Sequence, residues 1–305
     1  RVGIHDDFFE LGGDSILAIQ IISRAGQAGV HVTAKQLFTH PTIARLVTVA
    51  GSAPGIAAEQ SLVTGPVVAT PILRWFFEQE LPEPHHYNQA LLFTLSEPVE
   101  AALLERALRH LRLHHDALRL RFTRDAEGWH ARSGDGEGVF PLEQVDLSGL
   151  EPAARLAALE SHAARTQASL ELESGLLGRA VLYTLGAGEP RKLLLVLHHL
   201  VVDGVSWRVL LVDLLTVLAQ LRAGAPAVLP PKTTSFQQWA ERLAAFANSP
   251  ELEREAGYWK AQAAKQVAAL PVDGAGGPNT RASARRVSVM LDTEETQALL
   301  QAVPT

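Results

Sequence analysis

The sequence predicts a mixed α/β domain that is preceded by a small all-α segment. Apolar residues recur at helical spacing in the first fifty residues, and a stretch rich in Ala, Gly, Ser and Pro follows them. Beyond that stretch, helical periods alternate with short runs of β-prone residues, and no internal repeat is visible. We therefore expect three parts: residues 1–50, a linker at residues 51–67, and residues 68–305.

The first part is predicted to contain three short helices. One covers Ile16 to Gln27 and ends near Gly29, and a second covers Thr33 to Phe38. A third follows Pro41, which suits a first helical position, and its apolar residues fall on one face at Ile43, Leu46 and Val47.

The large part alternates helices and strands. Helices are expected at residues 99–114, 152–172, 206–222, 235–247 and 251–266, and strands at residues 118–123, 179–185, 191–197 and 285–291. Loops are expected at residues 134–138, 186–190 and 271–278. Asp292 with Glu295 predicts a capping-box start to a last helix, and Trp239 and Trp259 are expected in the core.

Two adjacent histidines, His198 and His199, follow directly after an apolar, β-prone run. Asp203 and Gly204 then supply turn chemistry, and Ser206 can cap the apolar segment beyond them. The pair is therefore expected where a buried strand gives way to a loop and a helix. Because imidazole changes charge near neutral pH, a histidine at the mouth of a cleft can take and return protons. The alternative is two core histidines bonded to backbone carbonyls.

The string at residues 198–207, HHLVVDGVSW, resembles the HHxxxDG signature of the condensation-type superfamily of nonribosomal peptide synthetases. Its continuation through Arg208 is similar to the epimerization branch. Residues 70–76 are similar to the opening motif of epimerization domains, with Leu73 in place of the usual Gln, and residues 114–122 to the second core motif of the superfamily. The resemblance implies one lobe of a chloramphenicol-acetyltransferase-like fold, in which helices pack on a mixed sheet.

The resemblance also implies roles for individual residues. His199 would take or return the α-proton of a carrier-bound aminoacyl or peptidyl thioester, converting the L form to the D form, and His198 would support the loop. Asp203 would be either a second catalytic group or the structural ion-pair partner of Arg119. The N–H groups near Gly204, and a helix beginning at Ser206, are candidates to stabilise the developing enolate charge.

Inversion also requires protonation from the opposite face. The epimerization family supplies that group as a Glu in its other lobe, and the corresponding motif does not occur in this sequence. Two alternatives therefore stay open. One is a condensation domain that uses the same histidines to form a peptide bond, and the other is a non-catalytic fragment that docks a carrier.

The string at residues 7–16, DFFELGGDSI, is similar to the attachment site of a peptidyl carrier domain, which implies a 4'-phosphopantetheine arm on Ser15. The two glycines allow a tight turn, and Ser15 stands at a helix start, where orphan N–H groups favour a phosphodiester. The alternative is that Asp14 or Ser15 is only a helix cap. Compared with complete carrier domains, the first helix of the bundle is expected to be missing.

The composition of the chain argues against several other classes of function. The net charge of −6 without a basic stripe argues against nucleic acid, and Asp213 interrupts the longest apolar stretch, so no membrane span is expected. The chain has no Cys and no HExxH string, so we expect no metal site; His85 and His86 are interpreted as packing or solvated residues. A cytoplasmic protein is expected, with a phosphopantetheinyl transferase, an upstream adenylation domain and a downstream condensation domain as partners.

Overall fold

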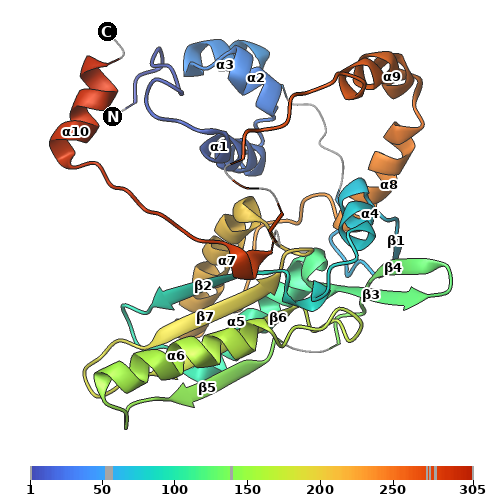
Figure 1. Ribbon diagram of the computed structural model, residues 1–305. Coiled ribbons are helices and arrows are strands. Elements are labelled where there is room, and N and C mark those ends of the chain that lie inside the picture. Colours follow the sequence, from blue (N-terminus) through green and yellow to red (C-terminus); the bar gives the residue numbers. More distant parts are fainter. Residues whose placement is uncertain are drawn as a thin grey trace. The chain divides into compact units, whose positions relative to one another are not determined.

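A computed structural model describes residues 2–51, 58–137, 140–272, 274, 276–277 and 280–303 of the chain. Figure 1 shows the helices and strands in these residues. The chain divides into two compact units, Arg1–Glu253 and Arg254–Thr305.

The N-terminal part contains the three predicted helices: α1 (Ser15–Gln27), α2 (Ala34–Thr39) and α3 (Ile43–Val49). They share a small apolar core formed by Ala18, Val32 and Leu37, with Phe8, Ile22, Leu46 and Ala50 packed against it. The prediction that Pro41 occupies the first helical position is wrong: α3 begins at Ile43, and Thr42 is its N-cap, whose side chain accepts the N–H of Arg45.

The larger domain is built on a four-stranded sheet of order β2-β7-β6-β5, with β2 (Asn88–Thr94), β7 (Lys192–His198), β6 (Gly178–Thr184) and β5 (Leu142–Asp146). The β2–β7 and β7–β6 pairs are antiparallel, and β5 pairs with β6 in parallel. The predicted strands at 179–185 and 191–197 are therefore present as neighbours. Their nearly continuous apolar sequence is explained by burial on both faces.

Helices cover both faces of this sheet (Figure 1). Helix α6 (Pro152–Gln167) packs on one face, where Leu159 joins a cluster with Val181 and Val196. Helices α5 (Ala101–His114) and α7 (Gly204–Arg222) pack on the other face, in the larger core that includes Leu195 and Leu197. Strand β7 ends at His198 and α7 begins at Gly204, so the two histidines lie at the end of the strand, just before the short loop that leads into the helix.

A second, three-stranded sheet has the order β1-β4-β3, with β1 (Gly65–Val67), β4 (Gly128–Ser133) and β3 (Leu120–Asp125). Strand β1 falls within the predicted linker at residues 51–67, and pairs antiparallel with β4. The end of that linker is therefore part of the folded domain. Strand β3 begins two residues later than predicted because the short 3-10 helix η2 (Asp116–Arg119) precedes it.

The remaining helices of this domain are α4 (Pro71–Glu78), the 3-10 helix η1 (Pro84–His86) and α8 (Phe236–Ala247); α9 (Pro250–Ala263) follows α8. Helix α6 ends at Gln167 and not at Leu172 as predicted, although Leu172 is fully buried. The prediction that Trp239 and Trp259 belong to the core is wrong, because their exposed fractions are 54% and 58%.

The C-terminal unit contains η3 (Arg281–Ser283), α10 (Thr293–Gln297) and the π-helical turn η4 (Ala298–Ala302). The capping box of Asp292 and Glu295 is confirmed at the start of α10. The strand predicted at residues 285–291 is wrong: this segment has no regular structure, and Val287 and Met290 are 88% and 94% exposed. Alternating apolar residues do not make a strand without a partner to pair with.

Among the residues described, α7 is the one helix long and apolar enough to span a membrane. It packs against α5, and Leu214, Val217 and Leu218 on it are buried in the main core.

Candidate active site at the end of strand β7

The two histidines lie where the sequence analysis placed them, between a buried strand and a helix. Strand β7 ends at His198, which is opposite Asn88 of β2. The chain then leaves the sheet, and the backbone N–H of His199 donates to the carbonyl of Tyr87 at 2.8 Å. The β2–β7 register and the loop after β7 thus fix the positions of the two imidazole rings.

The ring of His199 is held by two hydrogen bonds and one stacking contact. Its Nδ1 lies 2.9 Å from the carbonyl oxygen of Val202, which can only accept, so Nδ1 carries the proton. Its Nε2 lies 3.1 Å from the side-chain nitrogen of Gln89, so Nε2 presents its lone pair. The ring of Tyr87 stacks on it, with 5.1 Å between centroids and 16° between planes.

His199 faces a depression of about 350 Å³. Its lining is largely apolar, and includes Leu73, Trp75, Phe76, Tyr87, Val202 and Phe236. A half-buried imidazole whose Nδ1 donates to a carbonyl and whose Nε2 acts as an acceptor, beside an apolar cleft, is the arrangement that a general base requires.

His198 is fully buried. Its Nε2 donates to the carbonyl of Pro84 at 2.8 Å, and its Nδ1 accepts the N–H of Leu200 at 3.1 Å. Burial lowers the pKa of His198 to about 4, so the ring is neutral at physiological pH. His198 is fully buried, does not line the depression that His199 faces, and has both ring nitrogens bonded to neighbouring groups, so it holds the loop and does not face a substrate.

Asp203 caps helix α7. One carboxylate oxygen accepts the N–H of Val205 at 3.1 Å, the N–H of Ser206 at 2.7 Å and the hydroxyl of Ser206 at 2.7 Å. Partial burial raises the pKa of Asp203, but the hydrogen bonds from Ser206 and Val205 outweigh it, so the pKa is lowered and the group is ionised.

This geometry corrects two predictions, one about the start of the helix and one about the N–H groups there. The cap of α7 is Asp203, with Ser206 as its donor, and the helix begins at Gly204. The N–H groups of Val205 and Ser206 are occupied by Asp203, so they are not free to stabilise an enolate. Gly204 contributes the first residue of the helix.

The predicted ion pair between Asp203 and Arg119 is wrong, because both side chains are bonded elsewhere. Arg119 is 1% exposed, and it donates to the carbonyls of Arg112, Leu113 and Val63 at 2.9 to 3.0 Å. It therefore ties the segment before β1 to the end of α5. A buried guanidinium can be satisfied by several carbonyl oxygens as well as by a carboxylate.

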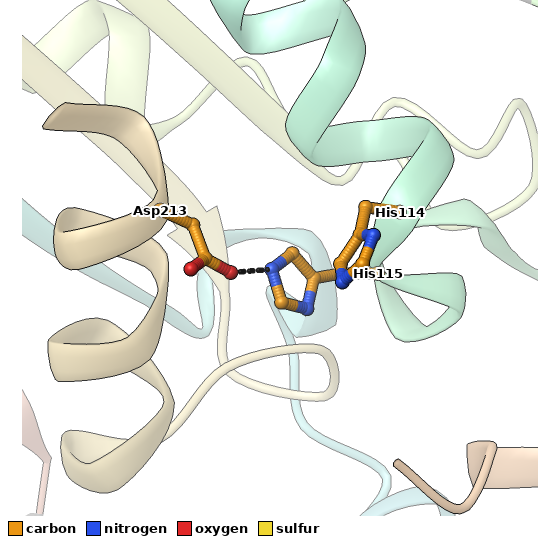
Figure 2. A group of neighbouring side chains, drawn as sticks. All are labelled: His114, His115 and Asp213. Carbon is orange, nitrogen blue, oxygen red and sulfur yellow. Dashed lines mark hydrogen bonds and ion pairs between the residues drawn. The ribbon is translucent and has the colours of Figure 1, made fainter. Parts of the chain in front are cut away.

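A second polar group, missed by the sequence analysis, is formed by His114, His115 and Asp213 (Figure 2). His115 Nε2 lies 2.7 Å from Asp213 Oδ2, and Asp213 is 8% exposed. One ligand atom from each of the three residues lies within 4.8 Å of the others. No sequence spacing could reveal this group, because Asp213 is 98 residues from His115.

This group lies beside the first depression. His115 lines a hollow of about 250 Å³, and Asp203 and Ser206 line both this hollow and the one that His199 faces. Burial lowers the pKa of His114, which keeps that ring neutral. The hydrogen bond to His115 supplies the partner that the buried carboxylate of Asp213 requires.

The pair His85 and His86 does not form a site with the other histidines. His85 Nδ1 accepts the backbone N–H of Leu172 at 3.2 Å, and His86 lies 3.8 Å from the carboxylate of Glu83 near the surface. These contacts agree with the interpretation of both residues as packing or solvated side chains.

Ser15 is exposed at the first position of α1. The carboxylate of Asp14 caps the helix by accepting the N–H of Leu17 at 2.7 Å. Gly13 lies against Phe8, where a Cβ would come within 2.4 Å of a carbonyl oxygen, so this position requires glycine. The tight loop therefore presents Ser15 on the surface, where a phosphodiester-linked arm fits without steric conflict.

The fold and these motifs define a carrier segment followed by one lobe of the chloramphenicol-acetyltransferase-like type. Residues 65–304 match the family described as Condensation domain, and residues 1–50 match the one described as Phosphopantetheine attachment site. The chain belongs to the condensation-domain family of nonribosomal peptide synthetases, and its attachment segment indicates a covalently attached 4'-phosphopantetheine.

Relatives at high identity are large synthetases. The chain is 48% identical over its whole length to a linear gramicidin synthase from Brevibacillus parabrevis, and 50% identical over 99% of its length to chondramide synthase cmdD from Chondromyces crocatus. It spans only 6% and 8% of these two proteins.

Among solved structures, the epimerization domain from the third module of tyrocidine synthetase B matches with a TM-score of 0.73 and 33% identity. The match covers 80% of this chain and 55% of that domain. The starter condensation domain of rhizomide synthetase matches with a TM-score of 0.57 and 22% identity, over 67% of this chain and 49% of that one, and shows the shared fold.

Proposed function

We propose that this chain is part of a module that epimerizes an aminoacyl or peptidyl thioester held on a phosphopantetheine arm, with His199 as a general base. The observation that carries the proposal is the His199 ring, which lines an apolar depression with its Nδ1 bonded to the carbonyl of Val202 and its Nε2 accepting from the amide of Gln89. The higher similarity to an epimerization domain than to condensation domains supports the same choice.

The arm supplies a thioester, which acidifies the α-C–H of the bound amino acid. His199 Nε2 gives up its hydrogen bond from Gln89 and takes that proton, and the electron pair of the C–H bond moves toward the thioester carbonyl. Val202 holds the Nδ1 proton in place, so the ring becomes an imidazolium with a fixed orientation. Trp75 and Phe76 give the depression apolar walls, which would exclude water once a substrate fills it and so strengthen the interactions around the developing charge.

Inversion requires that a proton is delivered to the opposite face of the α-carbon. The chain spans 55% of the length of the matched epimerization domain, and we assign the opposing acid to the remaining part of the domain. Within the described residues, His198 has both ring nitrogens bonded to backbone and Asp203 is an ionised cap, so neither is assigned this role.

The test uses the synthetase module that contains this chain, loaded at Ser15 with an L-aminoacyl arm. Exchange of the α-proton with solvent and the D/L ratio of released product are measured for the parent and for His199→Ala. We expect a loss of about a hundredfold or more in exchange, as for removal of a general base. An unchanged exchange rate in His199→Ala would refute the assignment.

The condensation reaction is the second candidate, because the family that matches residues 65–304 is described as Condensation domain. In that case the same histidine would help an amine attack a carrier thioester. Measuring dipeptide release with a loaded donor and acceptor separates the two reactions. Release of dipeptide without α-proton exchange would favour condensation, and a holo carrier that binds with neither reaction would indicate a docking role.

The proposed partners follow from the carrier segment. Ser15 would be modified by a phosphopantetheinyl transferase that uses coenzyme A, and an upstream adenylation domain would supply the amino acid. A downstream condensation domain would receive the D-configured thioester. We expect all of these in the cytoplasm.

A further inference from the structure

The side-chain amide of Gln89 connects His199 to Trp207. Its oxygen accepts the indole N–H of Trp207 at 2.8 Å, and its nitrogen lies 3.1 Å from Nε2 of His199. Trp207 is buried, with 6% of its surface exposed, and its indole nitrogen is a donor only. The indole therefore fixes the amide so that the NH₂ group points at His199.

The position of Gln89 is set by the sheet. It lies on β2 opposite Leu197 of β7, two residues before His199. The β2–β7 register and the packing of α7 thus bring Gln89 next to His199 and Trp207, which are 110 and 118 residues away from it in the sequence.

This arrangement favours one protonation state of His199. While Nδ1 donates to the carbonyl of Val202, Nε2 can accept the Gln89 N–H. When Nε2 takes a proton, it becomes a donor that faces another donor. The amide cannot simply turn over, because its NH₂ group would then face the indole N–H of Trp207 and two donors would again oppose each other.

We propose that Gln89 is a positioning residue that disfavours the protonated form of His199 and so promotes return of the proton to the substrate. This inference rests on the proposed function, because only a reversible proton transfer needs a base that readily gives its proton back. Trp207 contributes by holding the amide in the orientation that presents a donor.

The test replaces the donor by an acceptor in the full chain. In Gln89→Glu, a carboxylate can accept from Trp207 and from a protonated Nε2 at the same time, so the imidazolium is stabilised. Gln266→Glu, at an exposed position outside the site, is the matched control for the added negative charge. The ring nitrogens of His199 are followed by ¹⁵N NMR across a pH series.

We expect the control to show an Nδ1-protonated neutral ring near pH 7, and Gln89→Glu to hold the doubly protonated ring to a pH at least one unit higher. In the loaded module we expect α-proton exchange to fall about tenfold in Gln89→Glu and to be unchanged in the Gln266→Glu control. A His199 ring that titrates at the same pH in both variants would overturn the proposal.

Trp207→Phe provides a second variant that leaves Gln89 in place. Loss of the indole N–H frees the amide to turn over and accept from a protonated Nε2, so the ring should again stay protonated to higher pH. If Gln89→Glu does not fold, Trp207→Phe tests the proposal in its place. A His199 ring that titrates in Trp207→Phe at the same pH as in the parent would overturn the role of Gln89. A parent module without α-proton exchange would instead refute the proposed function, which the NMR result alone does not test.

Discussion

His115 Nε2 lies 2.7 Å from Asp213 Oδ2, and this contact joins the end of α5 to the middle of α7. Both helices pack on the same face of the four-stranded sheet. The contact therefore crosslinks the two helices that lie behind the active-site loop, at a point where the carboxylate is nearly inaccessible to water.

We expect Asp213→Ala to lower the free energy of unfolding by about 2 to 4 kcal/mol, because it creates a void and leaves His115 without its buried partner. Asp213→Asn keeps an acceptor oxygen and should cost about half as much. Urea unfolding followed by circular dichroism measures both. Equal stability of the two variants and the parent would contradict a structural role.

The same group tests the expectation that the chain has no metal site. If the His115–Asp213 hydrogen bond is the whole function of the group, addition of Co²⁺ should leave the visible absorption spectrum unchanged in the parent and in His114→Ala. A d–d absorption band that appears in the parent and disappears in His114→Ala would instead identify a metal centre.

His198 should make stability depend on pH. Its pKa is about 4 in the folded chain against 6.5 for the free side chain, so the unfolded chain binds more protons between these values. The contribution is fully present above about pH 6.5 and is lost as the pH falls toward 4. It amounts to about 3 kcal/mol, from 1.36 kcal/mol per unit of pKa.

The measurement is the free energy of unfolding at several pH values in the parent and in His198→Gln, with His110→Gln on the exposed face of α5 as the control. We expect the difference between parent and His198→Gln to shrink as the pH falls from 6.5 to 4. A difference that is constant across this range would show that His198 takes up a proton in the folded state.

Asp203 and Arg119 should act independently. Asp203→Ala removes a helix cap and should cost about 1 kcal/mol, whereas Arg119→Leu leaves buried carbonyls without a donor and should cost about 3 kcal/mol or more. A double-mutant cycle should give a coupling below about 0.5 kcal/mol. A coupling of about 2 kcal/mol would restore the ion pair that the structure does not show.

Ser15→Ala should abolish attachment of the arm. We expect the parent to gain the mass of one phosphopantetheine when incubated with a phosphopantetheinyl transferase and coenzyme A, and Ser15→Ala to gain none. Intact mass spectrometry checks this, with Ser61→Ala, an exposed serine outside the carrier segment, as the control. Modification of Ser15→Ala would move the attachment site to another residue.

The sequence alone determined the parts of this protein that depend on neighbouring residues. Helical and strand periods predicted α5, α6, β6, β7 and α7, and the strand-to-loop position of His199 follows directly from the end of an apolar run. The loop before Ser15 could also be predicted locally, because two successive glycines allow a tight turn, and Gly12 does adopt a positive φ of 87°.

Only the tertiary structure decided which side chains meet. Arg119 donates to the carbonyl of Val63, 56 residues away, and Asp213 bonds to His115, 98 residues away, because sheet register and helix packing set these contacts. The Gln89 bridge between Trp207 and His199 has the same origin, since it requires β2, β7 and α7 to be in place together. Local periodicity carries no information about such contacts, which is why the protonation state of the candidate base could be read only from the folded chain.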